Sequence, residues 1–226
     1  MKISNCYKFI WIIAINLLLG FSFVGGISAQ DLEVTENKSP KISIHAPIDP
    51  NEPPTGGKPI SDEKPGTALI NYNLGMEHLK RHQYDEAIND FDQAVSIDPN
   101  LAAAYNNRGL ARFAQGDYVD AISDYDQAIK LDPTKAYSYK DRGLAHYYQR
   151  EYKTASEDYS KAISIDNKDD LAYINRGLVR FKMGNNKGAI EDCDRALALS
   201  PKNAQALSIR AEARSKLPEI KESIKD

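Results

Sequence analysis

The side chains best suited to bind a metal or move a proton are the histidines, two of which stand close together. His78 and His82 lie four residues apart, so on one helix both rings would project from the same face. A two-histidine metal site needs at least one more ligand, and the H-E-x-x-H pattern is missing because Glu77 precedes the pair. His146 occupies the same place as His78 in a repeat described below. We therefore expect packing or rim roles for these histidines and predict no metal site.

Nucleophilic and phosphate-binding motifs are missing from the sequence. It contains no G-x-S-x-G turn, no phosphate-binding loop and no glycine-rich dinucleotide motif. Two cysteines, Cys6 and Cys193, are too few for a disulfide framework or a multi-cysteine zinc site. Cys193 falls in an apolar position of the repeat, which favours a buried inert thiol over a nucleophile. The sequence thus predicts no catalytic residue, no cofactor and no enzymatic activity.

The charge of the chain is nearly balanced. Its 226 residues include 29 lysines and arginines against 32 aspartates and glutamates, a formal net charge of −3. No segment is strongly basic, whereas a nucleic-acid-binding face clusters positive charge to neutralise phosphates. We therefore expect a protein or peptide partner and no nucleic acid.

The amino terminus has the pattern of a secretory signal peptide. A short basic stretch, residues 1–8, precedes an apolar run from Phe9 to Val24, and small residues follow up to Ala29. Cleavage after Ala29 would export the mature chain to the periplasm or the cell exterior. The alternative is an uncleaved single-pass anchor, residues 9–24, because about 16 apolar residues are long for a signal peptide and short for the roughly 20 that span a bilayer. Membrane attachment is expected only in that second case.

A proline-rich segment, residues 30–66, follows the signal. Seven of the 11 prolines fall in it, together with a Gly-Gly and a Pro-Gly pair, and it has no helical or alternating apolar period. Such a segment cannot bury enough surface to offset the entropy of ordering, so we predict a disordered spacer. A docking peptide is the less favoured alternative, since the segment has no P-x-x-P core with basic flanks.

The rest of the chain is built on a 34-residue repeat. Glycines recur at this interval at positions 75, 109, 143 and 177. Two alanines follow each glycine at fixed distances, with an apolar or aromatic residue between them. The alanines are Ala87, Ala121, Ala155 and Ala189, then Ala94, Ala128, Ala162 and Ala196, and the residues between them are Phe91, Tyr125, Tyr159 and Cys193. In each copy, two runs of helical apolar spacing are separated by a polar turn.

This pattern resembles the tetratricopeptide repeat, and four consecutive copies carry the resemblance. It implies an all-α fold, a right-handed α-solenoid of four helix-turn-helix units with a carboxy-terminal capping helix. No unit covers its own apolar face, so stacking is expected to bury one continuous core. The expected units are residues 68–101, 102–135, 136–169 and 170–203, with the capping helix and tail at 204–226.

The fourth unit departs from the pattern at the start of its second helix. The other units have Tyr84, Tyr118 or Tyr152 there, whereas the fourth has Asn186 after Asn185. We expect the fourth unit to be the loosest.

Two charged rows run through the repeats. Aspartates recur in the second helices and arginines in the first helices, each arginine 18 residues after an aspartate. The rows are Asp90, Asp124, Asp158 and Asp192, and Arg108, Arg142, Arg176 and Arg210. One hypothesis is a ladder of pairs at that spacing, joining each unit to the next. The alternative is two independent solvated rows, because exposed pairs contribute only about 0–1 kcal/mol.

The resemblance also implies where a partner binds. In tetratricopeptide proteins partners usually lie in the groove lined by the first helices. Carried over position by position, that groove is lined by Tyr72, Met76, Leu79, Asn106, Leu110, Phe113, Lys140, Leu144, Tyr147, Ile174, Leu178 and Phe181. So much apolar surface suits an extended or helical peptide. The alternative is that some of these rows pack against a neighbouring unit.

One subclass of the family clamps the carboxy terminus of cytosolic heat-shock chaperones. It needs a basic residue and an asparagine in the first unit, an asparagine in the second and two basic residues in the third. Those positions here hold Tyr72 and Met76, then Asn107, then Tyr137 and Asp141. Only Asn107 matches, and Asp141 would repel a carboxylate. The sequence does not support a heat-shock carboxylate clamp.

These inferences combine into an exported, non-catalytic adaptor or scaffold that binds a peptide or protein in its concave groove. The alternative is a structural or assembly subunit of an envelope or secretory complex that uses its convex surface instead.

Overall fold

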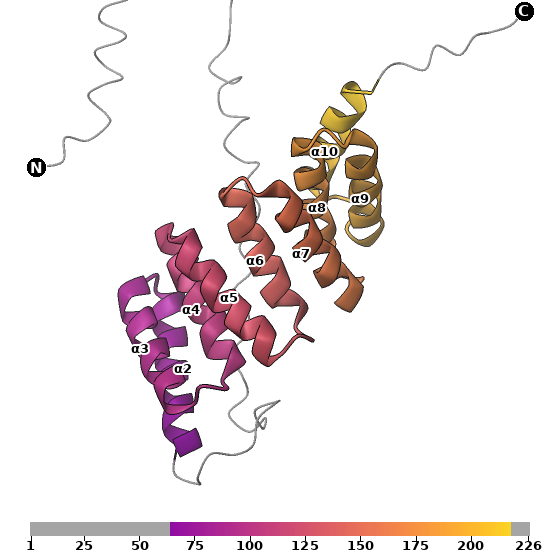
Figure 1. Cartoon of the computed structure of the whole chain (residues 1–226). Coiled ribbons are helices and arrows are strands. Elements are labelled where there is room, and N and C mark those ends of the chain that lie inside the picture. Colours follow the sequence, from indigo (N-terminus) through magenta and orange to yellow (C-terminus); the bar gives the residue numbers. More distant parts are fainter. Residues whose placement is uncertain (1–63, 218–226) are drawn as a thin grey trace, which may run out of the picture. The chain divides into compact units, whose positions relative to one another are not determined.

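The computed structural model describes residues 64–217, and all regular elements in that range are α-helices (Figure 1). They are α2 (Lys64–Lys80), α3 (Tyr84–Ile97), α4 (Ala102–Gln115), α5 (Tyr118–Leu131), α6 (Ala136–Tyr148), α7 (Tyr152–Ile165), α8 (Asp170–Lys182), α9 (Asn186–Leu199) and α10 (Ala204–Ser215). The predicted signal segment, the spacer up to residue 63 and the tail from residue 218 lie outside the described residues. For residues 64–217, the all-α fold class is confirmed.

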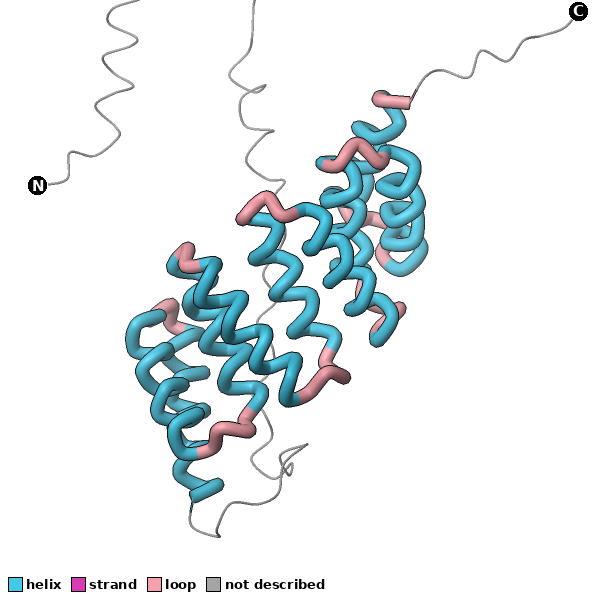
Figure 2. Tube along the Cα trace, viewed as in Figure 1, coloured by secondary structure: helices cyan, strands magenta, loops and turns pink. Residues whose placement is uncertain are grey.

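Consecutive helices pack in pairs that follow one another along the chain (Figure 2). The pairs are α2 with α3, α4 with α5, α6 with α7, and α8 with α9. The second helix of each pair also contacts the first helix of the next, and α10 packs on α9 and α8. Each unit therefore covers the apolar face of its neighbour, which is the packing of an α-solenoid. Helix α10 occupies the place expected for the capping helix.

Helix α2 begins inside the segment expected to be a spacer, since residues 64–66 are helical. Pro65 fits there because a proline in the first helical turn lacks only an N–H group that would have no partner in the helix. Ala68 and Tyr72, one turn and two turns further on, are buried against α3 and α4. This packing moves the boundary of the repeats toward the amino terminus relative to the sequence expectation.

The turn between the two helices of a unit contains one residue with positive φ. Glycine supplies it in the second and fourth units, with Gly116 at 88° and Gly184 at 79°. In the first and third units the same place is held by His82 at 59° and Arg150 at 64°. A residue with a Cβ is strained in this conformation by about 1–2 kcal/mol. The first and third units therefore close their turns less favourably than the other two.

The repeated glycine allows the two helices of a unit to approach closely. A Cβ on Gly109 would lie 2.8 Å from ring atom Cε1 of Tyr125 and 3.1 Å from the carbonyl oxygen of Ala121. A Cβ on Gly75 would lie 2.7 Å from the ring of Phe91. Both separations to the rings are far below van der Waals contact, so a side chain would force the aromatic ring to move.

The residues between the repeated alanines fill the core of each unit. Phe91, Tyr125, Tyr159 and Cys193 are each at most 1% exposed. Burial, and after it the charges of neighbouring aspartates, raises the pKa of the Cys193 thiol to about 12. Because the thiolate is the reactive form, Cys193 is an inert core residue near neutral pH, as the sequence indicates.

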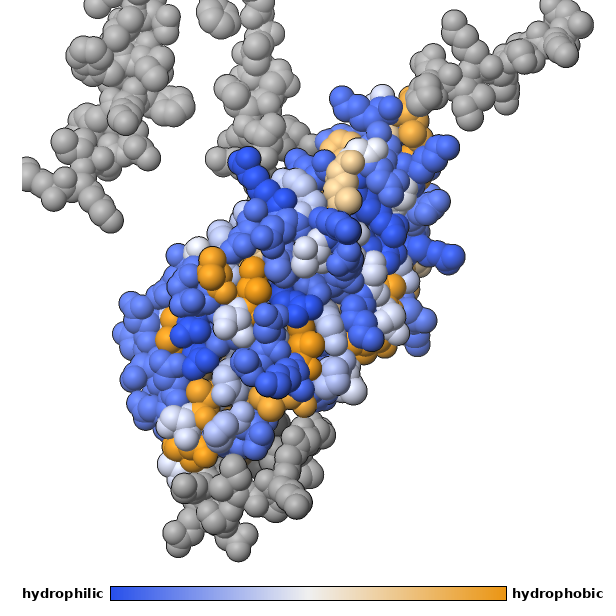
Figure 3. Space-filling view, in the orientation of Figure 1, coloured by the Kyte–Doolittle hydropathy of each residue, from blue (hydrophilic) through white to orange (hydrophobic). Residues whose placement is uncertain are grey.

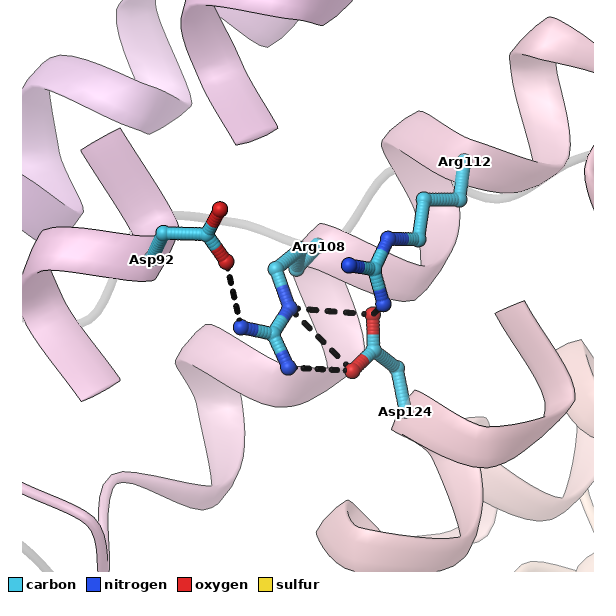
Figure 4. A network of polar contacts seen from close by, with 4 residues as sticks. All are labelled: Asp92, Arg108, Arg112 and Asp124. Carbon is cyan, nitrogen blue, oxygen red and sulfur yellow. Dashed lines mark hydrogen bonds and ion pairs between the residues drawn. The ribbon is translucent and has the colours of Figure 1, made fainter. Parts of the chain in front are cut away.

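An arginine of the second unit links two second helices (Figure 4). Arg108 donates from Nε to both carboxylate oxygens of Asp124 at 3.1 Å, and from Nη2 to Oδ1 at 2.5 Å. Its Nη1 donates to Asp92 of the preceding unit at 2.5 Å. Arg112 adds a bond to Asp124 at 2.7 Å. Burial acts to lower the pKa of Arg108, but the two carboxylates outweigh it and raise the pKa, so the guanidinium stays charged.

The same arrangement recurs along the repeats, with one exception. Arg142 binds Asp158 and Asp126, Arg176 binds Asp192, and Arg210 binds Asp194. The exception lies between the third and fourth units, where Arg176 donates to the hydroxyl of Ser160 at 3.1 Å. That junction therefore has a neutral hydrogen bond in place of an ion pair.

The predicted ladder is wrong in its partners. Asp90 does not pair with Arg108, because it bonds His78 at 2.6 Å within its own unit. The bond between units runs from Arg108 to Asp92, two residues further along α3. Residues 90 and 92 point to nearly opposite sides of a helix, so one faces its own first helix and the other faces the next unit. The alternative of solvated rows also fails, since Asp124 is 2% exposed.

Candidate partner-binding surface

Most of the side chains predicted to line the groove are buried. The buried members are Tyr72, Met76, Leu79, Asn106, Leu110, Phe113, Leu144, Ile174 and Leu178, none more than 6% exposed. Only Lys140, Tyr147 and Phe181 are half-buried. The structure thus places nine of the twelve residues in contacts between and within units, which is the alternative that the sequence left open. Contact with a partner stays a prediction, and it falls mainly on the three half-buried side chains.

Packing between units explains this burial. Leu110 of α4 belongs to one apolar cluster with Tyr72 and Met76 of α2, and Leu144 of α6 belongs to another with Phe113 of α4. Each first helix therefore covers the corresponding row of the one before it. The clusters are separate, so the single continuous core expected from the sequence is divided along the described repeats.

A buried polar strip crosses the first helices. The amide nitrogen of Asn106 donates to Asp141 at 3.1 Å, and that of Asn107 donates to the hydroxyl of Tyr72 at 2.9 Å. Each bond joins neighbouring units, and the side chains of Asn106, Asn107 and Asp141 are at most 3% exposed. Sequence reasoning missed this strip, although polar residues inside otherwise apolar rows were its signal. Because buried amides need partners, the strip fixes the register of one unit on the next.

The positions of a heat-shock carboxylate clamp are occupied by these internal contacts. Tyr72 and Met76 are each 1% exposed, and Asn107 is bonded to Tyr72. Asp141 accepts the bond from Asn106. Burial first, and then the charges of Asp132 and Asp141, raises the pKa of Tyr137 to about 12. None of these side chains supplies the positive charge that a carboxylate needs.

An aromatic patch lies where the first helices end and the second helices begin. It consists of Phe113 on α4, Tyr118 on α5, Tyr147 and Tyr148 on α6, and Tyr152 on α7. The rings of Tyr118 and Tyr148 stack at 5.2 Å with an interplanar angle of 24°, and Phe113 meets Tyr148 edge-on at 5.3 Å. Tyr147 continues the patch to Tyr152 at 5.7 Å. Tyr148 is 38% exposed and the other tyrosines are half-buried, so the patch forms part of the surface.

This patch has no counterpart in the first and fourth units. Where the third unit has Tyr148, the first and fourth units have Lys80 and Lys182. The sequence expectation named Phe113 and Tyr147 but not the other three rings, which come together only through the stacking of α4–α7. In Figure 3 the described surface is mostly hydrophilic, with separate apolar areas between charged ones.

The histidines each contact a different side chain. His78 bonds Asp90, His82 bonds the hydroxyl of Tyr84 at 3.0 Å, and His146 bonds a glutamate at 2.6 Å. His78 and His82 do not converge, because α2 ends at Lys80 and His82 lies in the turn. Within the described range, no three metal-binding side chains are grouped to hold an ion.

No helix between residues 64 and 217 is both long and apolar enough to cross a membrane.

The stacked helix pairs and the absence of a clustered catalytic site in residues 64–217 define an α-helical repeat protein of the interaction class. Family models confirm the repeat: residues 72–136, 143–184 and 171–203 each match a tetratricopeptide repeat model. The chain therefore contains tetratricopeptide repeats.

Solved structures of other tetratricopeptide proteins resemble this chain. MamA is 25% identical with a TM-score of 0.60, and the match covers 63% of this chain and 83% of that one. The Arabidopsis OM64 TPR domain is 29% identical with a TM-score of 0.50, covering 51% and 96%. The first TPR of Spaghetti (RPAP3), bound to the HSP90 peptide SRMEEVD, is 26% identical with a TM-score of 0.50, covering 50% and 90%. No curated protein matches the chain.

Proposed function

We propose that this protein is a non-catalytic adaptor that binds a peptide or protein partner on the face of its first helices. The observation that carries the proposal is the set of ordered repeats with aromatic side chains still partly open to solvent, Tyr147 and Phe181, on that face. The related RPAP3 domain, solved with a bound peptide, supports peptide binding in a repeat of this kind. The partner differs from a heat-shock carboxy terminus, because Asp141 and Tyr72 replace the clamp residues.

The burial of the groove rows decides which substitutions can test this proposal. Polar replacements at Leu110 or Leu144, which are 3% and 4% exposed, would destabilise the repeats and so lose binding for the wrong reason. Tyr147→Ser and Phe181→Ser remove half-buried surface instead. The experiment is partner capture by the full chain from its native compartment, followed by mass spectrometry of the retained proteins.

The expected result is that Tyr147→Ser and Phe181→Ser reduce capture of the same protein by tenfold or more, about 1.4 kcal/mol. The matched control is Val119→Ser on α5, an exposed side chain of a second helix. Circular dichroism of each variant checks that the helices persist. Capture that survives both groove substitutions contradicts the proposal.

An assembly role through the convex surface is the second candidate. Three second helices expose large apolar side chains: Val119 is 68%, Ile165 is 37% and Leu199 is 42% exposed. Loss of capture in Val119→Ser and Leu199→Ser, with capture kept in Tyr147→Ser, would favour this role.

We also propose that the chain is exported, with residues 1–29 removed after Ala29. The support is the signal pattern of the sequence, and an anchor formed by residues 9–24 is the competing possibility. Mass spectrometry of the native protein distinguishes them: a mature chain beginning at Gln30 supports cleavage, and a chain that retains Phe9 to Val24 contradicts it.

A further inference from the structure

The aromatic patch has tyrosine hydroxyls without bonds. In residues 64–217 the hydroxyls of Tyr118, Tyr147, Tyr148 and Tyr152 make no hydrogen bond, unlike those of Tyr72 and Tyr84. Four phenol donors thus project from a partly exposed surface of ring edges and faces. A ligand for this surface would offer apolar rings to the tyrosine rings and acceptor groups to the hydroxyls.

A proline-rich strand has both properties. In the polyproline II conformation the backbone makes no internal hydrogen bonds, and proline has no N–H, so the carbonyl groups are available as acceptors. Aromatic grooves that bind such strands are a recurring recognition mode, because the strand is already extended and loses little entropy on binding. The patch therefore fits an extended proline-rich segment better than an amphipathic helix, whose carbonyls are already bonded.

The chain itself contains such a segment. Residues 47–54 read Pro-Ile-Asp-Pro-Asn-Glu-Pro-Pro. Pro47, Pro50 and Pro53 are spaced by three residues, which is one turn of a polyproline II helix. In that conformation the three rings would lie along one edge, able to face the tyrosines together.

The charges of the segment also fit. Asp49 and Glu52 share the same three-residue spacing, so they would form a second, acidic edge. Lys182 holds the position of Tyr148 one unit further along, is exposed, and makes no ion pair within the described repeats. An acidic edge beside the prolines would therefore have a lysine within reach on the neighbouring unit.

The segment is long enough to reach the patch. Residues 55–63 connect it to the start of α2, and nine extended residues span up to about 30 Å. Helix α2 is about 25 Å long, and the patch lies near the level at which the first helices end, two units along. With helix axes 8–10 Å apart from unit to unit, the straight path is of the order of 30 Å.

We propose that residues 47–54 dock on the aromatic patch of the same chain as a polyproline II strand. The prolines pack on the tyrosine rings, the tyrosine hydroxyls donate to the strand carbonyls, and the acidic edge faces Lys182. The inference rests on the proposed adaptor function, because Phe113 and Tyr147 belong to both surfaces. The docked segment then occupies part of the binding face, and a partner must displace it.

Photo-crosslinking in the full chain tests this docking. A photo-crosslinking amino acid replaces Asn51, which lies on neither the proline nor the acidic edge, and mass spectrometry maps its crosslinks. We expect crosslinks within one chain to residues 113–118 or 147–152, with a yield independent of protein concentration. Tyr148→Ala should lower the yield about fivefold, and the double change of Pro50→Ala and Pro53→Ala by a similar factor.

The matched control is Leu207→Ala, which removes a side chain 41% exposed on α10 and should leave the yield unchanged. The proline variants lie outside the repeats, so they test docking even if Tyr148→Ala disturbs folding. Crosslinks that miss the patch overturn the proposal, as do patch crosslinks that survive both the tyrosine and the proline changes. Crosslinks that join two chains overturn it in favour of a second copy as the occupant.

Partner capture separates this inference from the adaptor function. If the crosslink forms as expected but Tyr147→Ser and Phe181→Ser leave capture intact, the proposed binding face fails and the docking stands. If capture depends on those residues but residue 51 makes no crosslink to the patch, the docking fails and the adaptor function stands.

Discussion

The second and fourth units share one set of contacts and differ in their link to the preceding unit. Arg108 in the second unit and Arg176 in the fourth both hold a buried aspartate of their own second helix in two-pronged bonds. Toward the preceding unit, Arg108 meets the carboxylate of Asp92, whereas Arg176 meets the hydroxyl of Ser160. The bond within the unit is thus kept where the bond between units changes.

The close approach of helices also differs between these units. A Cβ on Gly109 would lie 2.8 Å from the ring of Tyr125, whereas on Gly177 its shortest contacts, Cys193 among them, would be 3.3 Å. The smaller core residue leaves more room in the fourth unit. Both differences point in the direction of the sequence expectation that the fourth unit is the loosest, which stays a prediction until its hydrogen exchange is compared with that of the second unit.

The comparison teaches that a unit is held together by buried contacts, while junctions tolerate substitution at their exposed edge. Asp124 is 3% exposed as a side chain, and Asp92 is 50% exposed. Removing a buried charge leaves its partners uncompensated, whereas an exposed pair competes with water. The variants below test this difference, beginning with the largest effect.

Asp124→Ala should cause the largest loss of stability. It leaves Arg108 and Arg112, which are 13% and 23% exposed as side chains, without their shared carboxylate. We expect the free energy of unfolding to fall by about 3 kcal/mol, measured by urea unfolding followed by circular dichroism. Asp192→Ala should cost about the same in the fourth unit, because its bonds are alike.

The control for this prediction is Asp92→Ala, which removes only the exposed side of the network. Its expected cost is about 0–1 kcal/mol. Equal losses in Asp92→Ala and Asp124→Ala would contradict the distinction between buried and exposed bonds.

Gly109→Ala and Gly177→Ala should differ although they occupy the same repeat position. The new Cβ in Gly109→Ala meets the Tyr125 ring and should cost about 1–2 kcal/mol. In Gly177→Ala the contacts can relax by a few tenths of an ångström, and alanine gains up to about 1 kcal/mol of helix propensity. Thermal unfolding midpoints measure both, and a loss in Gly177→Ala as large as in Gly109→Ala would refute the argument.

Arg150→Gly should stabilise the third unit by about 1 kcal/mol. It removes the Cβ from a residue with φ 64°, where the second and fourth units already have glycine. The reverse change, Gly116→Ala, should destabilise by a similar amount, since its φ is 88°. Urea midpoints of the two variants should therefore move in opposite directions.

Ser160→Asp should give the smallest effect, a gain of about 0.5 kcal/mol. It supplies the carboxylate that the other junctions have, within reach of Arg176. The gain should shrink as salt rises, because the pair is partly exposed. Ser160→Asn, neutral and of similar shape, is the control, and an equal gain in that variant would show that charge is not the cause.

The 34-residue period predicted the fold because small, aromatic and apolar residues recur at fixed positions, and Gly109 with Tyr125 is one pair that the structure brings together as expected. The period could not choose between Asp90 and Asp92 as the partner of Arg108, since both lie on α3 and only the crossing of the helices decides which one faces the next unit. Similarly, the rows that contain Leu110 and Leu144 were identified as a helix face, but the sequence could not show that the adjacent unit covers them.

By itself, the sequence determined the number of units, the residues at close helix contacts and the inert character of Cys193, because each of these depends on local spacing and residue size. The tertiary structure decided which charges pair, which groove side chains remain open and where the aromatic rings of α4–α7 gather. Those outcomes depend on how one unit is rotated and offset on the next. That geometry is fixed by the packing of all the units together, so no single stretch of sequence contains it.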